Sequence, residues 1–524
     1  MSVTSSRQHF VASVVVTAEQ MRQIEERVFA AGMPVAALME KVAGLIAHRV
    51  MELYPLGAGL RVGVLVGPGH NGGDALVVAR ELHSRGYRVK CFQPFARMKE
   101  LTEAHAQYCS SLGIPRVGWE ALADCDVLID GLFGFGLARS LTGDVAVAID
   151  EINQGSIPVV SIDLPSGLHT DTGTVLGTAM RATHTLCLGL WKQGLLQDGA
   201  LAWTGHAELI DFDLPLADIQ AVVGETPVLR RSTPATAIAH LPLRRSPTAH
   251  KYTQGHLLVI AGSRQYSGAA VLTALGARAS GVGMVTIAVP ESLKPLLTSQ
   301  LPEALVVGCP ETATGAISQL PESLALDRYT AIACGPGLSP EPQTVVRAVL
   351  DGSVPVVLDA DGLNILAAQQ GVCALGDRPV PTILTPHPGE FKRLFPALEA
   401  AACRVTAVQQ AATIAGAIVL LKGARVAISD GARTWLNPES TPALARGGSG
   451  DVLTGVLGGL VAQAWKAAPT ASLLDVVQAG AWWHAQAGIL AAQDRTEMGV
   501  DALTLSQYLL PSLIRAQTRP VTPT

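Results

Sequence analysis

Residues 447–455, GGSGDVLTG, place three glycines before one carboxylate and an apolar, helix-compatible run. Gly447, Gly448 and Gly450 let backbone amides turn toward a ligand without side chains in the way, at the positive end of a helix dipole. Such an arrangement suits an anion, in particular the charge that spreads over a phosphoryl group in flight. Asp451 stands where it can accept the proton of an attacking hydroxyl, which is typical of phosphoryl transfer. A simple helix cap by Asp451 is the structural alternative.

Other loops of the C-terminal half carry polar residues directly after apolar runs. Lys422 follows such a run in LLKGA, a suitable place for nucleotide phosphates, although a lone lysine there is more often solvated. His387 stands between two prolines in TPHPGE, where a purely structural histidine is the alternative. The stretches CGPGL (334–338) and DADGLN (359–364) follow two further runs. No G-x-x-x-x-G-K-[ST] occurs in the sequence, which excludes the familiar P-loop.

The N-terminal half has its own glycine-rich turn, GPGHNGGDA (67–75), which satisfies G-x-G-x-x-G between a predicted strand and a predicted helix. A Rossmann dehydrogenase is therefore one hypothesis. The next strand, RVKCFQPF, ends without the acid that would hold a ribose hydroxyl. Asn71 and Asp74 instead add oxygen atoms that phosphate binding alone does not require. A tight turn capped by Asp74 is the structural alternative.

Oxygen-bearing side chains also follow two later strands of this half. Asp130 opens DGLFGFGLARSLTG, and both Asp163 and Ser166 lie in SIDLPSG. Together with Asn71 they are expected at one edge of a sheet, where hard oxygen ligands suit an alkali or alkaline-earth cation. A loop cap is the alternative role for each aspartate. Lys192, in LGLWKQGLL, is by itself expected to be an ordinary solvated lysine.

The elements that must position these residues form two series of alternating strands and helices. In the first, the apolar run LRVGVLVG precedes helical periodicity in ALVVARELHSRG, and the alternation repeats through DVLIDG and IPVVSIDLPSG. The second opens with HLLVIAG, continues through MVTIAVP, AIACGPGL and AIVLLKGA, and is expected to close on two helices. Both patterns are typical of parallel sheets with ligands at the carboxyl ends of the strands. The sequence therefore predicts an α/β protein.

The alternation breaks between about Leu214 and His250, where Pro, Ser, Thr and Arg are frequent. Because 524 residues exceed one ordinary core, we predict two domains, residues 1–219 and 226–521. Near the N-terminus, Thr17 followed by Gln20 predicts a capping box and a leading helix over TAEQMRQIEERVF.

Composition and charge exclude several classes of protein. The chain is 48% hydrophobic and 15% charged, as expected of a soluble globular enzyme. A net charge of −5 offers no basic surface for nucleic acid, and no apolar run approaches membrane-spanning length. The eight cysteines form no C-x-x-C pair, which favours a reducing cytoplasm. We expect small-molecule ligands, a cytoplasmic location and a homo-oligomer.

The N-terminal motifs resemble the NAD(P)H-hydrate epimerase family over nearly all of residues 10–215. LMEKVAG, NGGDA, DGLFGFG, SIDLPSG and a late lysine occur in the family's order. The resemblance implies a Rossmann-like three-layer αβα domain that interconverts the R and S hydrates of NADH and NADPH. It implies Asp163 as the acid/base with Lys192 as its partner, and K⁺ bound by Asn71, Asp130 and Ser166. The implied substrate-binding residues are Asn71, Gly72, Gly73, Asp74, Ala75, Gly134, Phe135, Gly136, Leu137, Ala138, Arg139, Ser140 and Asp163.

One residue departs from this family pattern, because Ala75 stands where the family has glycine. Alanine would strain the chain if the position needed a positive φ, and would be harmless if the position needed only a small residue. The family is also similar to non-catalytic binding modules, and the retained Asp163 and Lys192 favour an active enzyme.

The C-terminal motifs resemble the ADP-dependent NAD(P)H-hydrate dehydratase family, which has a ribokinase-like αβα fold, over residues 240–515. HKYTQGH, AGSRQYSGAA, GPGL, DADGLN, TPHPGE, LLKGA and GGSGDVLTG occur in order. The resemblance implies ADP with Mg²⁺ as the second ligand and Asp451 as the base. The implied substrate-binding residues are Ala269, Gly337, His387 and Asp451, and the implied ADP- or AMP-binding residues are Lys422, Gly423, Ala424, Arg425, Val426 and Gly450.

The two halves complement each other chemically. A kinase-like site fixes its acceptor hydroxyl in line with the phosphoryl donor, so it can accept only one epimer of a hydrated nicotinamide. A fused epimerase would convert the other epimer into that substrate. As a whole the chain resembles bifunctional NAD(P)H-hydrate repair enzymes. The alternative is a ribokinase-like vitamin-precursor kinase fused to a non-catalytic nucleotide-binding module. The residues alone do not decide between ADP and ATP, or between NADH and NADPH hydrates.

Overall fold

The structure, a computed structural model, describes residues 3–57, 59–398, 403–469 and 472–518. It divides into two compact units, with the division between Val228 and Leu229. The stretch where the sequence alternation breaks is more regular than expected, since it forms α8 (Leu216–Val223), β10 (Leu229–Arg231) and α9 (Pro234–His240). Within the described ranges, no helix has both the length and the apolar character needed to cross a membrane.

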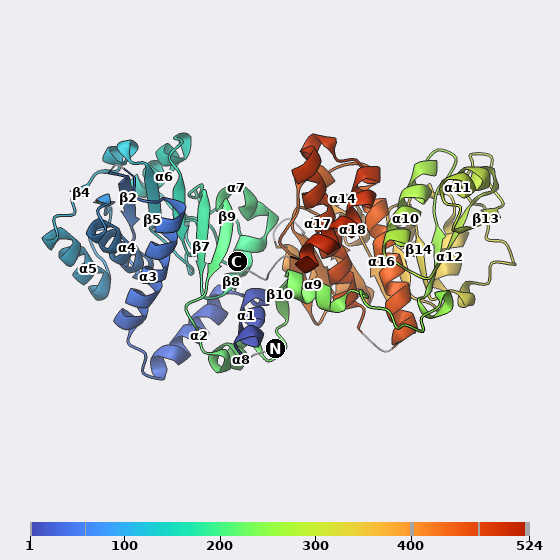
Figure 1. Cartoon of the computed structure of the whole chain (residues 1–524), viewed down its shortest axis with the longest axis horizontal. Coiled ribbons are helices and arrows are strands. Elements are labelled where there is room, and N and C mark those ends of the chain that lie inside the picture. The colour runs from blue at the N-terminus through green and yellow to red at the C-terminus, as the bar shows by residue number, and fades with distance from the viewer. Residues whose placement is uncertain (1–2, 58, 399–402, 470–471, 519–524) are drawn as a thin grey trace. The chain divides into compact units, whose positions relative to one another are not determined.

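The first unit is built on a seven-stranded sheet in the order β4-β3-β2-β5-β6-β7-β9, and every neighbouring pair is parallel (Figure 1). The strands are β2 (Arg61–Val66), β3 (Arg88–Phe92), β4 (Arg116–Val117), β5 (Val127–Gly131), β6 (Val159–Ile162), β7 (His184–Leu188) and β9 (His206–Ile210). Its main helices are α3 (Val35–Leu53), α4 (His70–Ser84), α5 (Glu100–Ser111) and α6 (Asp144–Gln154). The parallel sheet predicted for this half is thereby confirmed.

Strand β2 shows why this sheet is buried on both faces. Val62, Val64 and Val66 belong to the apolar cluster that includes α3 and α4. Leu65, which points the other way, packs in a second cluster with Leu128 of β5. A strand with both faces covered must be apolar at every position, which explains the continuous run in the sequence.

The N-terminal segment adds two helices and a short strand to this unit. α1 (Val3–Ser13) was not expected, whereas α2 (Ala18–Ala30) confirms the predicted leading helix. Thr17 caps α2 with the predicted capping box to Gln20. Between the helices, β1 (Val15–Val16) pairs in parallel with β8 (Trp191–Lys192). The pairing of β1 with β8 therefore fixes the backbone position of Lys192.

The second unit has a ten-stranded sheet in the order β10-β19-β18-β17-β16-β15-β14-β11-β12-β13. Its strands after β10 are β11 (His256–Ile260), β12 (Met284–Pro290), β13 (Leu305–Cys309), β14 (Ala331–Cys334), β15 (Val356–Leu358), β16 (Thr382–Leu384), β17 (Ile418–Leu421), β18 (Val426–Ser429) and β19 (Thr434–Asn437). Pairs β17–β18 and β18–β19 are antiparallel, and the others are parallel. Four residues, 422–425, join β17 to β18. A connection this short cannot cross over a sheet, which is why the strand direction reverses here.

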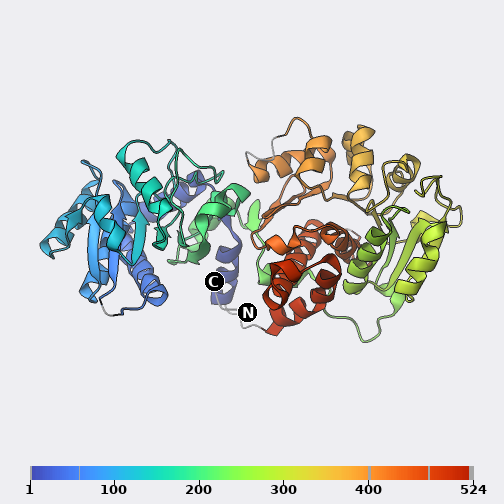
Figure 2. The same ribbon diagram turned by 90° about the horizontal axis from the view of Figure 1, so that it is seen from above.

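Helices cover both sides of the second sheet. Figure 2 shows α16 (Ser449–Ala467), α17 (Leu474–Arg495) and α18 (Ala502–Thr518) in red on one side of this unit, and the orange segment with α14 (Pro388–Leu394) and α15 (Arg404–Ala415) on the other. The sequence predicted two closing helices, but three are present, because α17 and α18 are separated by a short turn that contains Gly499. α10 (Ser267–Ala279) packs against α16.

Candidate active sites

The glycine-rich turn of the first unit is shorter than the sequence indicated. α4 begins at His70, so residues 71–75 form the first turns of a helix, and the predicted loop and the cap by Asp74 are both wrong. The first turn of α4 packs closely against the end of β2, because a methyl group on Gly72 would lie 2.0 Å from the carbonyl oxygen of Gly67. Ala75 is fully buried inside α4 without a positive φ. Alanine at this position therefore causes no backbone strain.

Asp163 and Lys192 form a buried ion pair at the end of β6. The lysine Nζ lies 2.5 Å from Oδ1 of Asp163, and their side chains are 0% and 3% exposed. Burial is the largest single influence and lowers the pKa of Lys192, but the charge and hydrogen bond of Asp163, together with Cys187 and Glu25, outweigh it, so the pKa of the lysine is raised. Lys192 is thus not the solvated lysine expected from its type alone. Asp163 has a φ of 68°, a strained backbone conformation of the kind that is concentrated at functional sites.

The loop after β5 is held against this pair. The N–H of Phe135 donates to Oδ2 of Asp163 at 2.8 Å, and the N–H of Gly136 donates to Oγ1 of Thr170 at 3.1 Å. The ring centroid of Phe135 lies 5.7 Å from Nζ of Lys192. The loop is therefore positioned by the same carboxylate that binds the lysine.

A cavity of about 880 Å³ opens over these groups. Of the substrate-binding residues that the sequence implied, the cavity lining includes Asn71, Asp74, Gly134, Phe135, Gly136, Leu137, Ala138, Arg139 and Asp163, and Lys192 also lines it. Gly72, Gly73 and Ala75 lie buried beneath the lining, and Ser140 is exposed outside it. The volume is within the range of small-molecule sites.

Asp130 and Ser166 lie below the cavity lining. Oγ of Ser166 donates to Oδ1 of Asp130 at 2.6 Å, and its N–H donates to Oδ2 at 2.9 Å. Burial raises the pKa of Asp130, although these hydrogen bonds oppose the rise. Within the described ranges, no basic side chain pairs with this carboxylate. A buried carboxylate with only neutral partners suits a bound cation.

Asn71, the third implied potassium ligand, lies beside Asp163 and Gly134, and no hydrogen bond joins it to Asp130 or Ser166 in the described structure. A methyl group on Gly134 would lie 3.0 Å from Oδ1 of Asn71 and 3.0 Å from Oδ2 of Asp163, so both oxygens converge beside Gly134. Nδ2 of Asn71 is buried without a hydrogen-bond partner in the described structure. Asn71 lines the cavity, so this amide N–H is available to donate a hydrogen bond to a bound molecule.

Two further carboxyl groups lie in the cavity wall. Burial raises the pKa of Glu25, on α2, to about 7, and the charge of Asp163 adds to this while Lys192 opposes it. Burial together with the charges of Asp163 and Glu25 raises the pKa of Asp74 well above its usual value. Sequence reasoning missed Glu25, because the helix that carries it lies far from the other motifs along the chain.

In the second unit, α16 begins at the GGSGD stretch. Gly448 precedes the helix with a φ of 88°, the left-handed conformation that glycine favours. Among the described residues, the backbone N–H groups of Gly450 and Asp451 have no protein acceptor. Two unpaired N–H groups at a helix N-terminus form an anion site.

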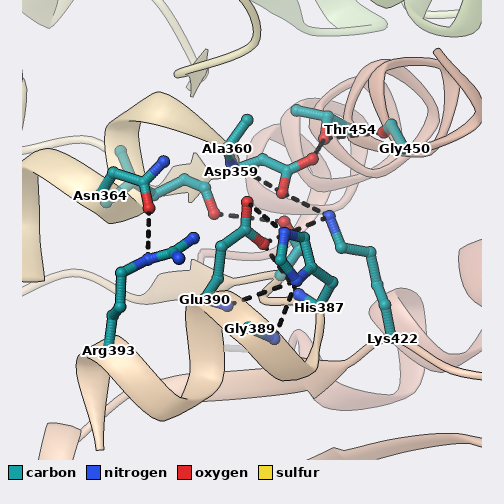
Figure 3. A network of polar contacts seen from close by, with 12 residues as sticks. Asp359, Ala360, Asn364, His387, Gly389, Glu390, Arg393, Lys422, Gly450 and Thr454 are labelled. Carbon is teal, nitrogen blue, oxygen red and sulfur yellow. Dashed lines mark hydrogen bonds and ion pairs between the residues drawn. The ribbon is translucent and has the colours of Figure 1, made fainter. Parts of the chain in front are cut away.

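A network of charged groups lies beside this helix start (Figure 3). Nζ of Lys422, at the end of β17, lies 2.7 Å from Oδ1 of Asp359, at the end of β15. Oγ1 of Thr454, one turn into α16, donates to Oδ2 of Asp359 at 2.6 Å. A methyl group on Gly450 would lie 3.5 Å from Nζ of Lys422. The network therefore joins two strand ends to the helix start.

Glu390 and His387 complete the network from α14. Oε2 of Glu390 lies 3.9 Å from Nζ of Lys422 and accepts the N–H of His387 at 2.8 Å. Nδ1 of His387 accepts the N–H groups of Gly389 and Glu390, so the histidine caps α14. Its side chain is 51% exposed, and Nε2 lies 3.4 Å from Oε1 of Glu390. His387 therefore has a structural role, the alternative foreseen from the sequence, with both ring nitrogens near partners on α14.

Asp451 is half-buried beside these charges. Burial raises its pKa to about 6, and the negative charge of Asp359 adds to the shift while Lys422 opposes it. Burial alone lowers the pKa of Lys422, but Asp359 and Glu390 outweigh this and raise it. At neutral pH the site therefore combines an ionised acceptor with a protonated lysine.

The remaining implied residues lie in two groups. Ala269 and Gly337 are neighbours, since a methyl group on Gly337 would lie 2.8 Å from Cβ of Ala269. The predicted nucleotide-binding stretch, 422–426, covers the connection between β17 and β18 and the first residue of β18; Gly423 and Ala424 are exposed, and Lys422, Arg425 and Val426 are partly buried.

Two supporting residues could not be found from the sequence. Nη2 of Arg404 donates to the carbonyl oxygens of Leu421 and Lys422, both at 2.8 Å. Nε2 of His484, on α17, lies 3.0 Å from the carbonyl oxygen of Ser449, and burial lowers its pKa to about 4. Each is a single residue in an apolar helix, without a motif around it.

Two α/β units, each with charged groups gathered at the ends of its parallel strands, define an enzyme with two separate small-molecule sites. Two family models match the chain, one described as YjeF-related protein N-terminus over residues 35–194 and one described as NAD(P)H-hydrate dehydratase over residues 257–511. The bifunctional NAD(P)H-hydrate repair enzyme Nnr of Thermosynechococcus vestitus is 54% identical over 507 residues, which are 96% of this chain and 98% of that protein.

An enzyme of the same name from Synechocystis is 55% identical over 500 residues, which are 95% of this chain and 94% of that protein. Among solved structures, an ADP/ATP-dependent NAD(P)H-hydrate dehydratase from Bacillus subtilis, co-crystallised with ATP and Mg²⁺, is 33% identical. It covers 54% of this chain and 97% of its own, with a TM-score of 0.46. The chain belongs to the family of bifunctional NAD(P)H-hydrate repair enzymes. This membership favours hydrate repair over the alternative of a vitamin-precursor kinase.

Proposed function

We propose that the chain repairs hydrated NADH and NADPH in two steps. The first unit interconverts the R and S hydrates, and the second dehydrates the S hydrate with ADP, giving NAD(P)H, AMP and phosphate. The proposal rests on the family membership and on the presence in this chain of a charged site in each unit. We further propose that the units correspond to domains 1–219 and 226–521.

The second unit is arranged for phosphoryl transfer to a hydroxyl. Asp451 accepts the hydroxyl proton, and the N–H groups of Gly450 and Asp451 stabilise the charge on the moving phosphoryl group. Lys422, at the start of the 422–426 stretch, neutralises nucleotide phosphates. The phosphate then leaves with the electrons of the C–O bond, and loss of a proton from the neighbouring carbon restores the dihydronicotinamide. Ala269, Gly337 and His387 are proposed to hold the hydrated ring.

The first unit is arranged to hold a charged pair beside its substrate. Lys192 pairs with Asp163, and residues 134–140 with residues 71–75 are proposed to form the binding region for the hydrated nicotinamide. The family resemblance implied Asp163 as the acid/base. Because both of its carboxyl oxygens already have partners in Lys192, Leu188 and Phe135, we propose instead that it balances positive charge that develops on the ring. The cavity volume of about 880 Å³ supports a ligand of dinucleotide size.

Two cations are proposed as cofactors. We propose that Asn71, Asp130 and Ser166 bind K⁺ through side-chain oxygens, and the support is Asp130, a buried carboxylate whose hydrogen-bond partners are neutral. When bound, K⁺ would offset the charge of Asp130. Mg²⁺ would enter the second unit with ADP and neutralise its phosphates.

A cytoplasmic location agrees with the absence of disulfides among the eight cysteines, all within the described residues. The homo-oligomer stays a prediction, which light scattering of the purified chain tests.

The observation that carries the proposal is the position of Asp451 beside two unpaired N–H groups and the Lys422–Asp359 pair. The test supplies each purified hydrate epimer with ADP and Mg²⁺ and follows the return of dihydronicotinamide absorbance. We expect NAD(P)H from both epimers, with stoichiometric AMP and phosphate. A stable phosphorylated product without NAD(P)H would identify a kinase instead.

A further inference from the structure

The epimerisation proposed for the first unit needs a proton donor that the Asp163–Lys192 pair does not supply. Oδ1 of Asp163 binds Nζ of Lys192 and also accepts the N–H of Leu188 at 3.3 Å, and Oδ2 accepts the N–H of Phe135. The lysine also donates to the carbonyl oxygen of Leu188. Since the pKa of Lys192 is raised, it retains its proton, and the pair acts as a fixed charged unit.

Glu25 lies in the same cavity wall and comes from a different element. α2 is fixed at its start by the Thr17 capping box and by Asp171, whose Oδ1 accepts the N–H of Ala18 at 2.7 Å. Met21, one turn earlier on the face of Glu25, is buried, so the helix is packed where it carries this carboxyl. Within the described ranges, the Glu25 carboxyl has no hydrogen bond and no ion pair at contact distance. α2 therefore holds the Glu25 carboxyl in the cavity wall, and no hydrogen bond within the described ranges engages it.

Several charged groups surround this carboxyl. Burial is the main reason that its pKa lies near 7, and both Asp163 and the two lysines, Lys192 and Lys99, modify it. The titratable and charged groups that line the cavity with it are Arg22, Glu26, His70, Asp74, Lys99, Arg139, Asp163 and Lys192. Protonated and ionised Glu25 therefore coexist at neutral pH, the condition under which one group can both donate and recover a proton.

We propose that Glu25 is a catalytic acid of the epimerisation, acting on the hydroxyl of the hydrated ring while Asp163 stays paired with Lys192. This inference rests on the proposed function of the first unit. Glu25 donates its proton to the hydroxyl, and the C–O bond breaks with its electron pair on the departing water. The lone pair of the ring nitrogen forms a C=N bond, and the positive ring is stabilised by Asp163.

The second half of the reaction reverses these changes. Water adds to the planar carbon from the opposite face, its electron pair forms the new C–O bond, and the electrons of the C=N bond return to nitrogen. The proton that the added water loses returns to the Glu25 carboxylate. No oxidant or reductant is consumed, and the product differs from the substrate only in the hand of one carbon.

The test compares Glu25→Gln with the wild type in the full-length chain without ADP, so that the dehydratase is idle. Conversion of R hydrate to S hydrate is followed by chromatographic separation of the epimers, with an enzyme-free reaction subtracted. We expect kcat to fall at least about 100-fold with little change in KM. The wild-type kcat should decline above about pH 7, and this decline should be absent in the variant. The control is Glu19→Gln, an exposed position on the same helix.

The outcomes separate this inference from the proposal on which it rests. If the wild type equilibrates the epimers no faster than buffer, the proposed function of the first unit fails. If the wild type does so and Glu25→Gln matches it in rate and pH profile, only the role of Glu25 is overturned. If Glu25→Gln folds poorly, Glu25→Asp replaces it in the test. Its shorter side chain should shift the pH at which kcat declines. An unchanged pH midpoint would contradict Glu25 as the catalytic acid.

Discussion

The ammonium group of Lys422 is paired with Asp359 at 2.7 Å, although 63 residues separate them along the chain. The second oxygen of Asp359 accepts the hydroxyl hydrogen of Thr454 on α16. One buried carboxylate therefore fixes both the proposed phosphate-binding lysine and the helix whose N-terminus carries Asp451.

Replacement of Asp359 should weaken this unit and its activity together. Asp359→Asn removes the nearest charged partner of Lys422 and leaves only Glu390 at 3.9 Å, and loss of one partner of a buried pair costs about 3 kcal/mol. Urea unfolding followed by tryptophan fluorescence measures the free energy of unfolding. Asp377→Asn, an exposed position, is the control and should leave it unchanged.

Two glycines of α16 should separate activity from stability. A methyl group on Gly450 would meet atoms no closer than 3.5 Å, whereas one on Gly455 would lie 1.9 Å from the carbonyl oxygen of Thr273. We expect Gly450→Ala to fold normally but to lose ADP-dependent activity at least about tenfold, since the methyl group stands beside Lys422. Gly455→Ala should lower the unfolding temperature. Equal unfolding temperatures for the two variants would contradict these contacts.

Dehydration of the S hydrate should depend on the ionised form of Asp451. Because the pKa of this carboxyl is about 6, the acceptor is protonated at lower pH, and kcat/KM should fall about tenfold per pH unit below pH 6. His484 stays neutral over this range, since its pKa is about 4, and does not contribute. A profile that is flat between pH 5 and pH 7, by initial rates, would show that another group accepts the proton.

Lys192 should be essential to the first unit alone. Lys192→Met leaves the Asp163 carboxylate buried without its cation, and we expect epimerisation to fall at least about 100-fold. The variant should still dehydrate the S hydrate with ADP, because the second unit has its own core and site. Lys90→Met, which changes a lysine on β3 outside the cavity lining, is the matched control. Equal loss of both activities would indicate general unfolding.

The sequence predicted the elements whose signals are local. The Thr17 capping box, the apolar run of β2 and the strands before Asp163 and Lys422 all depend on neighbouring residues, and the structure has them. β18 and β19 were missed because they are four residues each and antiparallel within a series that reads as parallel. Helix α4 begins earlier than expected, because Gly69 rather than Asp74 precedes it.

The sequence predicted only those site residues that lie in recognisable motifs. Asp163, Lys192 and Asp451 stand in recognisable stretches, but their pairing and burial depend on the folded chain. Asp359 was seen only as a loop residue, because its partner Thr454 lies 95 residues away. Glu25 gave no signal, since its role depends on a helix that folds over a cavity lined by distant segments.

The most direct test of the central claim is the rate at which Asp451→Asn converts pure S hydrate to NAD(P)H with ADP and Mg²⁺. Asparagine keeps the size of the side chain but cannot accept the hydroxyl proton, so we expect kcat at least about 100-fold below that of the wild type, with epimerisation unchanged. Asp494→Asn, exposed on α17, should match the wild type. A wild-type rate in Asp451→Asn would contradict the assignment of Asp451 as the proton acceptor.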